Sequence, residues 1–212
     1  LPDLRRGRRH GDAAAVDAMI RDGLWDRSSD AHMGALTERL VDRFGVSRAA
    51  QDAYAAESHR RAVAAVEGGA FDEETVPVQT QDGVVESDEG PRPDTDEDAL
   101  AALDPAFASD GTITAGNASG LSDGAACLLL ASRDAVSDAG VDPLAHVVDY
   151  RVAYREPEWF SMAVADAVEA LLDATDLAVA DVDLFELNEA FAAQMVYVRD
   201  RLDIPRERLN TR

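Results

Sequence analysis

Lysine is absent from this sequence, so arginine supplies all of its permanent positive charge. The 20 arginines stand against 42 acidic residues, which gives a formal net charge of −22. A field of that sign repels DNA, RNA and anionic lipid, because each of these partners is itself negatively charged. The charge balance therefore excludes the nucleic-acid-binding and membrane-surface classes of protein.

Cysteine is almost absent as well. With Cys127 as its single cysteine, the chain can form neither an intramolecular disulfide nor a Cys-x-x-Cys metal site. No apolar run approaches membrane-spanning length, and the first residues contain no signal-peptide core. We therefore expect a cytoplasmic protein with no metal and no membrane partner.

The sequence is rich in acidic and apolar residues together. Hydrophobic residues make up 46% of the chain, which is too many for an acidic disordered segment, and they recur at helical spacing. We interpret the acidity as the solvated shell of a folded protein in molar salt, where ions screen its self-repulsion. This composition is typical of an extreme halophile and indicates no particular reaction.

The first 120 residues predict a mostly helical, loop-rich module. Gly45 is expected to end one helix, and Ser47 to begin the longest one, which Gly68 ends. Valines on both sides of Gln81-Asp82-Gly83 predict a short hairpin. The helices expected in this part are Asp12–Leu24, Met33–Phe44, Ser47–Gly68 and Ala99–Leu103.

From residue 124 onward, predicted strands alternate with helices. The wholly apolar run Ala125–Ala131 is typical of a strand buried on both faces of a parallel sheet. The remaining elements expected here are strands at about Ala145–Ala153 and Val182–Phe185, and helices at Arg133–Ala139, Trp159–Leu172 and Glu189–Leu202. The order predicts an α/β fold, a helical loop domain followed by an incomplete layered α/β portion.

A glycine-rich segment, GTITAGNASGLSDGAA, spans Gly111–Ala126. It suits an ordinary connection, in which Gly supplies backbone freedom and Asn and Ser form turn hydrogen bonds. It equally suits a ligand loop, in which the glycines let a ligand approach the backbone and Ser119 offers a hydroxyl. The glycine spacings of nucleotide-binding loops and hydrolases are missing, so neither class is indicated.

A second motif, ELNEAFAAQ, spans Glu186–Gln194. Asn188 would lie at or beside the N-terminus of the helix that follows, where Asn is favoured for capping alone. The alternative is an amide that orients a water or an oxyanion there, because the helix dipole favours negative charge. Phe191 on such a helix would ordinarily be a core residue. The residues by themselves leave both interpretations open.

The histidines and the cysteine are weak candidates for a base or a nucleophile. His32 lies near a helix start, where a lone histidine is more often a capping or packing residue than a catalyst. Cys127 lies inside the apolar run, and a thiol buried among apolar groups has a raised pKa and is inert. We expect Cys127 not to be the nucleophile.

A series of segments resembles the thiolase family, the acyl-CoA acyltransferases that make or cleave 3-ketoacyl-CoA. In the family's order they are HMG at His32–Gly34, SRAAQDAYAAESHRRA at Ser47–Ala62, GAFDEETVPV at Gly69–Val78, DEGPR at Asp88–Arg92, LDPAF at Leu103–Phe107, TAGNASGLSDGAA at Thr114–Ala126 and ELNEAFAAQ at Glu186–Gln194. The last two are specific, and the resemblance covers nearly the whole chain.

The resemblance implies the middle half of a thiolase. It divides the chain into a CoA-binding loop domain at 1–121, the last strand and helix of the N-terminal domain at 122–141, and the first part of the C-terminal domain at 142–212. It implies no cofactor, because coenzyme A is the substrate. The implied partners are CoA or acyl-CoA, and either further copies in a homo-oligomer or a complementing thiolase chain.

The resemblance also implies site residues. The Asn of NEAF, here Asn188, would hold a water that helps form an oxyanion hole. Arg92 would face the CoA phosphates, for which a fixed cation with a planar donor fork is suited. The implied positions that border CoA, its channel or the acyl pocket are Leu24, His32, Met33, Arg92, Phe107, Ser119 and Phe191.

The chain also departs from the family pattern. The nucleophilic Cys, the His of Gly-His-Pro and a second Cys are expected to lie outside this chain. Acyl transfer to a thiolate followed by attack of a CoA-bound carbanion needs two thiols and a base, and Cys127 cannot fill both roles. Phe160-Ser161-Met162-Ala163-Val164 stands where many thiolases have Met-Gly-x-Gly-Pro, which indicates a divergent branch.

A parallel sheet with so few strands cannot cover both faces of its buried strand. The chain alone is therefore expected to expose strand edges and apolar surface, or to recruit another chain. Three hypotheses remain. In the first, the chain is part of a thiolase, to which it supplies CoA binding and Asn188, and it is inactive in isolation. In the second, it is a non-catalytic subunit that binds CoA or a partner chain. In the third, it is an inactive gene fragment.

Overall fold

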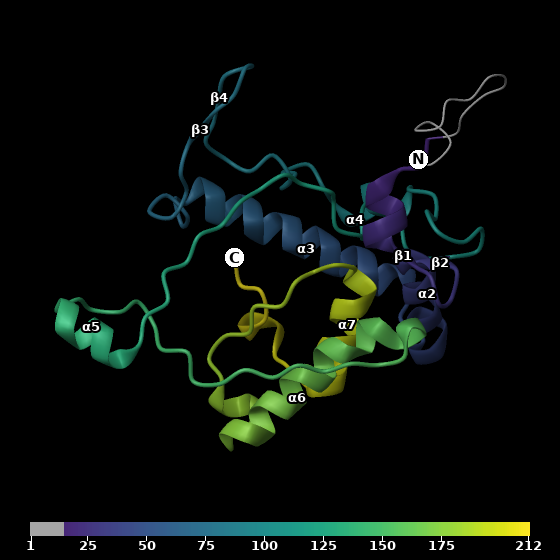
Figure 1. Cartoon of the computed structure of the whole chain (residues 1–212). Coiled ribbons are helices and arrows are strands. Elements are labelled where there is room, and N and C mark those ends of the chain that lie inside the picture. The colour runs from purple at the N-terminus through teal and green to yellow at the C-terminus, as the bar shows by residue number, and fades with distance from the viewer. Residues whose placement is uncertain (1–14) are drawn as a thin grey trace, which may run out of the picture.

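The computed structural model describes residues 15–212 (Figure 1). Within these residues, no helix is both long and apolar enough to cross a membrane. The elements in chain order are η1 (Met19–Leu24), β1 (Trp25–Asp26), β2 (Ala31–His32), α2 (Met33–Phe44), α3 (Arg48–Glu67), β3 (Val78–Gln79), β4 (Val84–Val85), α4 (Glu97–Ala101), α5 (Arg133–Ala139), η2 (Pro157–Met162), α6 (Ala163–Thr175), η3 (Val179–Asp181), α7 (Ala192–Leu202) and η4 (Arg206–Arg208).

The capping residues confirm helices α2 and α3. Gly45 ends α2 in the left-handed conformation, with φ 66°, which glycine adopts without steric cost. The Ser47 hydroxyl accepts a hydrogen bond from the Ala50 N–H at 3.1 Å and so caps α3. Gly68 follows the last residue of α3. The local sequence therefore determines both helices.

The core lies where α7 packs beneath α3 and against α2, η2 and α6 (Figure 1). Helix α7 is enclosed on nearly all sides, and Met195 and Val198 are completely buried. Leu40 of α2 and Leu209 near the C-terminus belong to the same cluster. Burial of this kind contributes about 1.5–3 kcal/mol for each large aliphatic side chain, so α7 anchors the helical body.

The predicted hairpin and the helix at Arg133–Ala139 are confirmed. Strands β3 and β4 pair antiparallel, with Val78 opposite Val85, and project from the body (Figure 1). Helix α5 has the predicted bounds, with a Ser132 cap and Gly140 at its end. None of its residues is buried, and it lies apart from the other helices at the end of long extended connections.

The predicted strands at Ala125–Ala131, Ala145–Ala153 and Val182–Phe185 are wrong. Among the described residues, the strands form only two-stranded antiparallel ribbons, and Phe185 makes a single parallel bridge to Leu209. A central parallel strand needs a hydrogen-bonded neighbour on each side, and the described chain supplies none to the first two segments. They therefore run as irregular, exposed chain.

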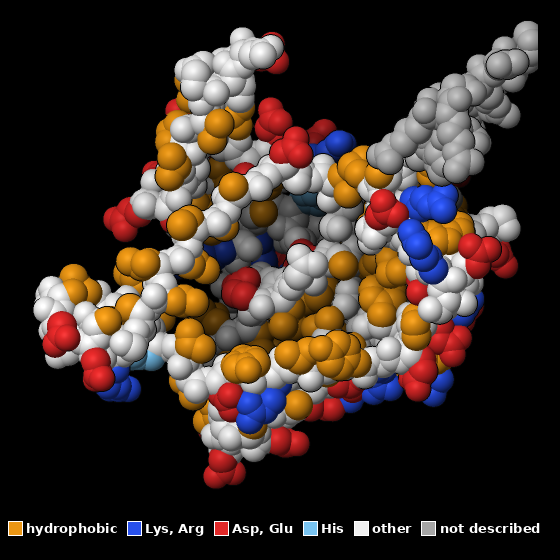
Figure 2. All heavy atoms as spheres, in the orientation of Figure 1, with side chains coloured by type: hydrophobic (Ala, Val, Ile, Leu, Met, Phe, Trp, Pro, Cys, Tyr) orange, Lys and Arg blue, Asp and Glu red, His pale blue; other side chains and the backbone are white. Residues whose placement is uncertain are grey.

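The expected exposure of apolar surface is confirmed. Leu128, Leu129 and Leu130 are 87%, 96% and 79% exposed, and Cys127 is exposed too, which corrects its expected burial. Figure 2 shows apolar side chains gathered around a hollow on this face of the molecule. Contiguous apolar surface of this kind is typical of protein interfaces and of ligand-binding grooves.

Several helix boundaries differ from the predicted ones. The helix expected from Asp12 is a single π-helical turn, η1; positions 12–14 lie outside the described residues. The predicted helix at Trp159 begins as the 3-10 segment η2 and becomes α-helical at Ala163, because the backbone at Trp159 is non-helical. Helix α7 starts at Ala192 rather than at Glu189.

Candidate functional site

Ser119 and Asn188 line one pocket of about 400 Å³. Its floor is the face of α3 that carries Tyr54, Ser58 and His59, and its rims are segment 116–122 and the loop 188–189. The pocket therefore lies where the two motifs singled out from the sequence meet the longest helix.

Two backbone hydrogen bonds join these motifs. The Ser119 N–H donates to the Ala190 carbonyl at 3.0 Å, and the Ala192 N–H donates to the Asn117 carbonyl at 2.9 Å. Between them Ala118 and Phe191 form an antiparallel bridge. Segments far apart in the sequence thus form one short ribbon that fixes the two pocket rims relative to each other.

Two buried carboxylates hold the glycine-rich loop. Oε1 of Glu38 on α2 accepts the N–H groups of Thr112 and Ile113, both at 2.8 Å. A Cβ on Gly111 would lie 2.4 Å from that oxygen, so a side chain at this position would displace the carboxylate. The one sign of this role in the sequence is a Glu on the buried face of α2, among Leu36, Leu40 and Val41.

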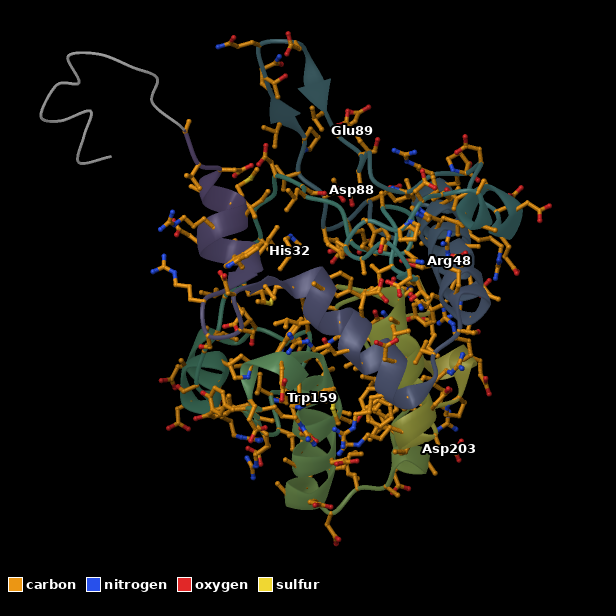
Figure 3. All side chains as sticks on the ribbon, turned by 90° about the vertical axis from the view of Figure 1, so that its right-hand side faces the viewer. His32, Arg48, Asp88, Glu89, Trp159 and Asp203 are labelled. Carbon is orange, nitrogen blue, oxygen red and sulfur yellow. The ribbon has the colours of Figure 1, made fainter. Side chains whose placement is uncertain are left out.

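Asp52 of α3 is the second carboxylate. It accepts the Asn117 side-chain N–H at 2.9 Å and pairs with Arg48 at 2.7 Å. Asn117 in turn accepts the Thr114 N–H at 2.8 Å through its own side chain, which closes the turn before Ser119. Arg48 lies at the start of α3, as Figure 3 shows. This anchor was not predicted from the sequence.

Asn188 does not cap a helix, so the helix-capping interpretation of this residue is wrong. Helix α7 begins only after Phe191, because Phe191 is held extended in its bridge to Ala118. Asn188 is exposed in the irregular segment before it, on the pocket rim. Within the described residues no protein group hydrogen-bonds its side-chain amide, so this amide is available to a ligand.

Three of the predicted residues form an aromatic row. The His32 and Phe107 rings stack with centroids 4.7 Å apart, and Phe107 meets Phe191 edge-on at 6.3 Å. A Cβ on Gly34 would lie 2.3 Å from the Phe107 ring, so the HMG glycine makes room for this stack. Figure 3 shows His32 at the start of α2.

The other predicted residues are more dispersed. Leu24 ends η1 and Met33 begins α2; both are half-buried, and neither lines the pocket between the motifs. Arg92 is exposed, and its side chain borders a separate pocket of about 560 Å³ along α3. Its backbone N–H donates to Nδ1 of His59 at 3.1 Å, which connects the DEGPR loop to the pocket floor.

Family models match almost all of this chain. The model described as the N-terminal domain of thiolase matches residues 1–134, and the C-terminal domain of thiolase matches 141–212. The chain belongs to the thiolase family. It is 42% identical over 215 aligned residues to an acetyl-CoA acetyltransferase of Pseudomonas aeruginosa, covering 99% of this chain and 55% of that protein.

Solved thiolases share the fold. The acetyl-CoA acetyltransferase of Bacillus anthracis superposes with a TM-score of 0.93 at 39% identity, over 100% of this chain and 54% of its own. The Ascaris suum thiolase Acat5, in complex with coenzyme A, gives 0.91 at 39% identity, over 98% and 54%. The chain thus has the α/β thiolase fold in part, and spans about half the length of these relatives.

The geometry of His32 predicts a pH dependence of stability. Burial lowers the pKa of His32 below its ordinary value of 6.5, because the charged imidazolium loses its hydration. Its Nδ1 also accepts the Gly34 N–H at 3.0 Å, which a protonated Nδ1 could not do. The unfolded chain therefore binds this proton at higher pH than the folded one, and the free energy of unfolding falls as pH drops below about 6.5.

Substitution of His32 by Asn tests this account. Asn can still cap α2 but does not titrate, so the loss of stability between pH 7.5 and pH 5.5 should be smaller in H32N than in the wild type. Chemical denaturation in molar salt at the two pH values measures it. An undiminished pH dependence in H32N would contradict the role of His32.

Proposed function

We propose that this chain is part of an acyl-CoA acyltransferase of the thiolase type, which catalyses the reversible Claisen condensation and thiolysis of 3-ketoacyl-CoA. The main support is the pocket between the two joined motifs, with the free amide of Asn188 on one rim and Ser119 on the other. The complex of the related Ascaris suum thiolase with coenzyme A supports the ligand class.

In this proposal the pantetheine arm of CoA lies along the pocket. Ser119 contributes a hydroxyl and a fixed backbone rim to the amides of the arm. The aromatic row of Phe191, Phe107 and His32 does not line this pocket and would border the continuation of the channel beyond it. The phosphates of CoA lie toward Arg92, and Leu24 and Met33 border the nucleotide side and the acyl pocket. No cofactor is required, because CoA is itself the substrate.

Asn188 stabilises the oxyanion that develops on a thioester carbonyl. Its amide N–H groups donate to that oxygen, directly or through a water, and such donors stabilise a developing charge more than the neutral ground state. The thiolate nucleophile, its base and the second thiol would come from outside these 212 residues. Cys127 is exposed on the segment before α5 and does not line the pocket.

The domain boundaries form part of the same proposal. Residues 1–121 would be the CoA-binding loop domain, 122–141 the last strand and helix of the N-terminal domain, and 142–212 the first part of the C-terminal domain. The long extended connections on both sides of α5 support a separate packing unit at 122–141.

Binding of coenzyme A tests the proposed function. Isothermal titration of CoA into the chain in molar salt should show saturable binding. R92A should raise the Kd about tenfold, because one charge-assisted contact to a phosphate is lost. N188A should leave the Kd within about twofold of the wild-type value. R133A, on the exposed helix α5, is the matched control for loss of one positive charge. Absence of CoA binding by the wild type would contradict the proposal.

A second candidate function is that of a subunit that completes a thiolase together with another chain. The exposed apolar segments favour it, because Leu128–Leu130 and Val147–Val148 have the composition of buried strands but no partners among the described residues. The occupant we propose is a polypeptide that supplies the missing neighbouring strands. It would be either the rest of a longer chain or a separate subunit.

Co-purification tests the second candidate. The part of the Pseudomonas aeruginosa relative that this chain does not match, expressed with it, should co-purify in molar salt. L129D should abolish the association, because the charge would enter a buried strand position. V84D, on the exposed ribbon β3–β4, should leave it unchanged. Equal recovery with the wild type and L129D would contradict this docking surface.

A further inference from the structure

We infer that Glu189 is a positioning residue, whose carboxylate fixes the backbone that carries Asn188 by accepting hydrogen bonds from three side chains in two separate parts of the chain, α3 and the C-terminal segment. The inference rests on the proposed function only in giving Asn188 a ligand to face. The contacts that carry it belong to the described structure itself.

Both oxygens of Glu189 are occupied by donors. Oε1 accepts the Tyr54 hydroxyl at 2.7 Å and the Asn210 side-chain N–H at 2.7 Å, and Oε2 accepts the Ser58 hydroxyl. Tyr54 and Ser58 lie one helical turn apart on α3, on the pocket floor. The residue next to Asn188 is therefore bound to the rigid helix and to the C-terminal segment at the same time.

Asn210 holds the other side of Asn188. Its side chain accepts the Leu187 N–H at 2.8 Å and donates to the Leu187 carbonyl at 2.7 Å, as a strand neighbour would. Its backbone has φ 44°, a left-handed conformation that Asn adopts more readily than most residues. Leu187 and Glu189 are thus both fixed, and only the side chain of Asn188 between them remains free.

The Asn210 segment is itself anchored to α3. The Arg61 guanidinium donates to the carbonyls of Arg206, Leu209 and Asn210 at 3.1, 2.9 and 2.9 Å. The Arg206 guanidinium lies over the Tyr54 ring, 4.6 Å from its centroid. Helix α3 therefore holds both the donors to Glu189 and the segment that carries the third donor.

The Tyr54 hydroxyl remains a hydrogen-bond donor in this network. Burial, the Glu189 charge and the hydrogen bond to it raise the pKa of Tyr54, so this hydroxyl stays protonated and remains a donor. Arg206, whose guanidinium lies over the Tyr54 ring, adds a positive charge near Glu189. Three protein donors bind the two oxygens of the carboxylate, which suits a positioning residue rather than a proton carrier.

Hydrogen–deuterium exchange of the whole chain in molar salt tests the inference. In E189A, exchange of the segment 185–191 should be faster by about tenfold or more, because the three hydrogen bonds of the carboxylate that oppose local opening are lost. In E189Q it should stay within about threefold of the wild type. The Gln oxygen can still accept from Tyr54 and Asn210, and the Ser58 hydroxyl can turn to accept the amide N–H.

The controls separate positioning from general stability. E186A removes an exposed carboxylate from the same loop and should change nothing. S58A removes one donor and should give a smaller increase than E189A, which keeps the test usable if E189A fails to fold. Exchange in α2 should be equal in all variants. The inference would be overturned if segment 185–191 exchanged in E189A at the wild-type rate. It would also be overturned if this segment exchanged as fast in E189Q as in E189A.

Titration with coenzyme A keeps this inference distinct from the proposed function. If E189A loosens the loop while the wild-type chain binds no CoA, the proposed function fails and the structural role of Glu189 stands. If the wild type binds CoA and the exchange of E189A equals that of the wild type, the positioning role fails and the proposed function stands.

Discussion

The structure of the candidate site depends on the short ribbon between Ala118 and Phe191. Two backbone hydrogen bonds, from Ser119 to Ala190 and from Ala192 to Asn117, connect the glycine-rich motif to the NEAF motif. Without them, the two rims of the pocket would be independent loops on a helical body. With them, a hydroxyl and a free amide are held at fixed positions along one pocket of about 400 Å³.

Acidic residues serve two different purposes in this chain. Most of them are solvated and account for the net charge of −22. Glu38, Asp52 and Glu189 instead point inward and accept hydrogen bonds from backbone N–H groups or from Asn, Tyr and Ser side chains. Glu38 and Asp52 are buried and Glu189 is half-buried. A carboxylate withdrawn from water is stable only when such donors replace its hydration, and each of the three holds a motif loop in return.

Local signals in the sequence predicted the elements that need no distant partner. Ser47 and Gly45 determine the ends of their helices through capping and a left-handed turn, and the hairpin around Gly83 forms from adjacent residues. The predicted strands failed for the opposite reason. A strand such as Ala125–Ala131 exists only with neighbours on both sides, and the described chain provides none.

The site residues divide in the same way, into those indicated by local sequence signals and those whose partners are distant in the sequence. Residue types and motif resemblance indicated Ser119, Phe191 and Asn188, and the structure brings Ser119 and Asn188 to one pocket. The start of α7 could not be predicted, because the bridge from Phe191 to Ala118 keeps the preceding residues extended. The roles of Glu189 and Asn210 were equally hidden, since their partners lie on α3 and near the C-terminus.

The central claim is that the joined motifs form one wall of a coenzyme A site. A crystal structure of the chain grown with CoA in molar salt tests it most directly. We expect the pantetheine arm to lie against Ser119 and Asn188, with the loop backbone unchanged and the Asn188 amide directed at the ligand. Coenzyme A bound elsewhere, or a pocket closed by movement of one rim away from the other, would contradict it.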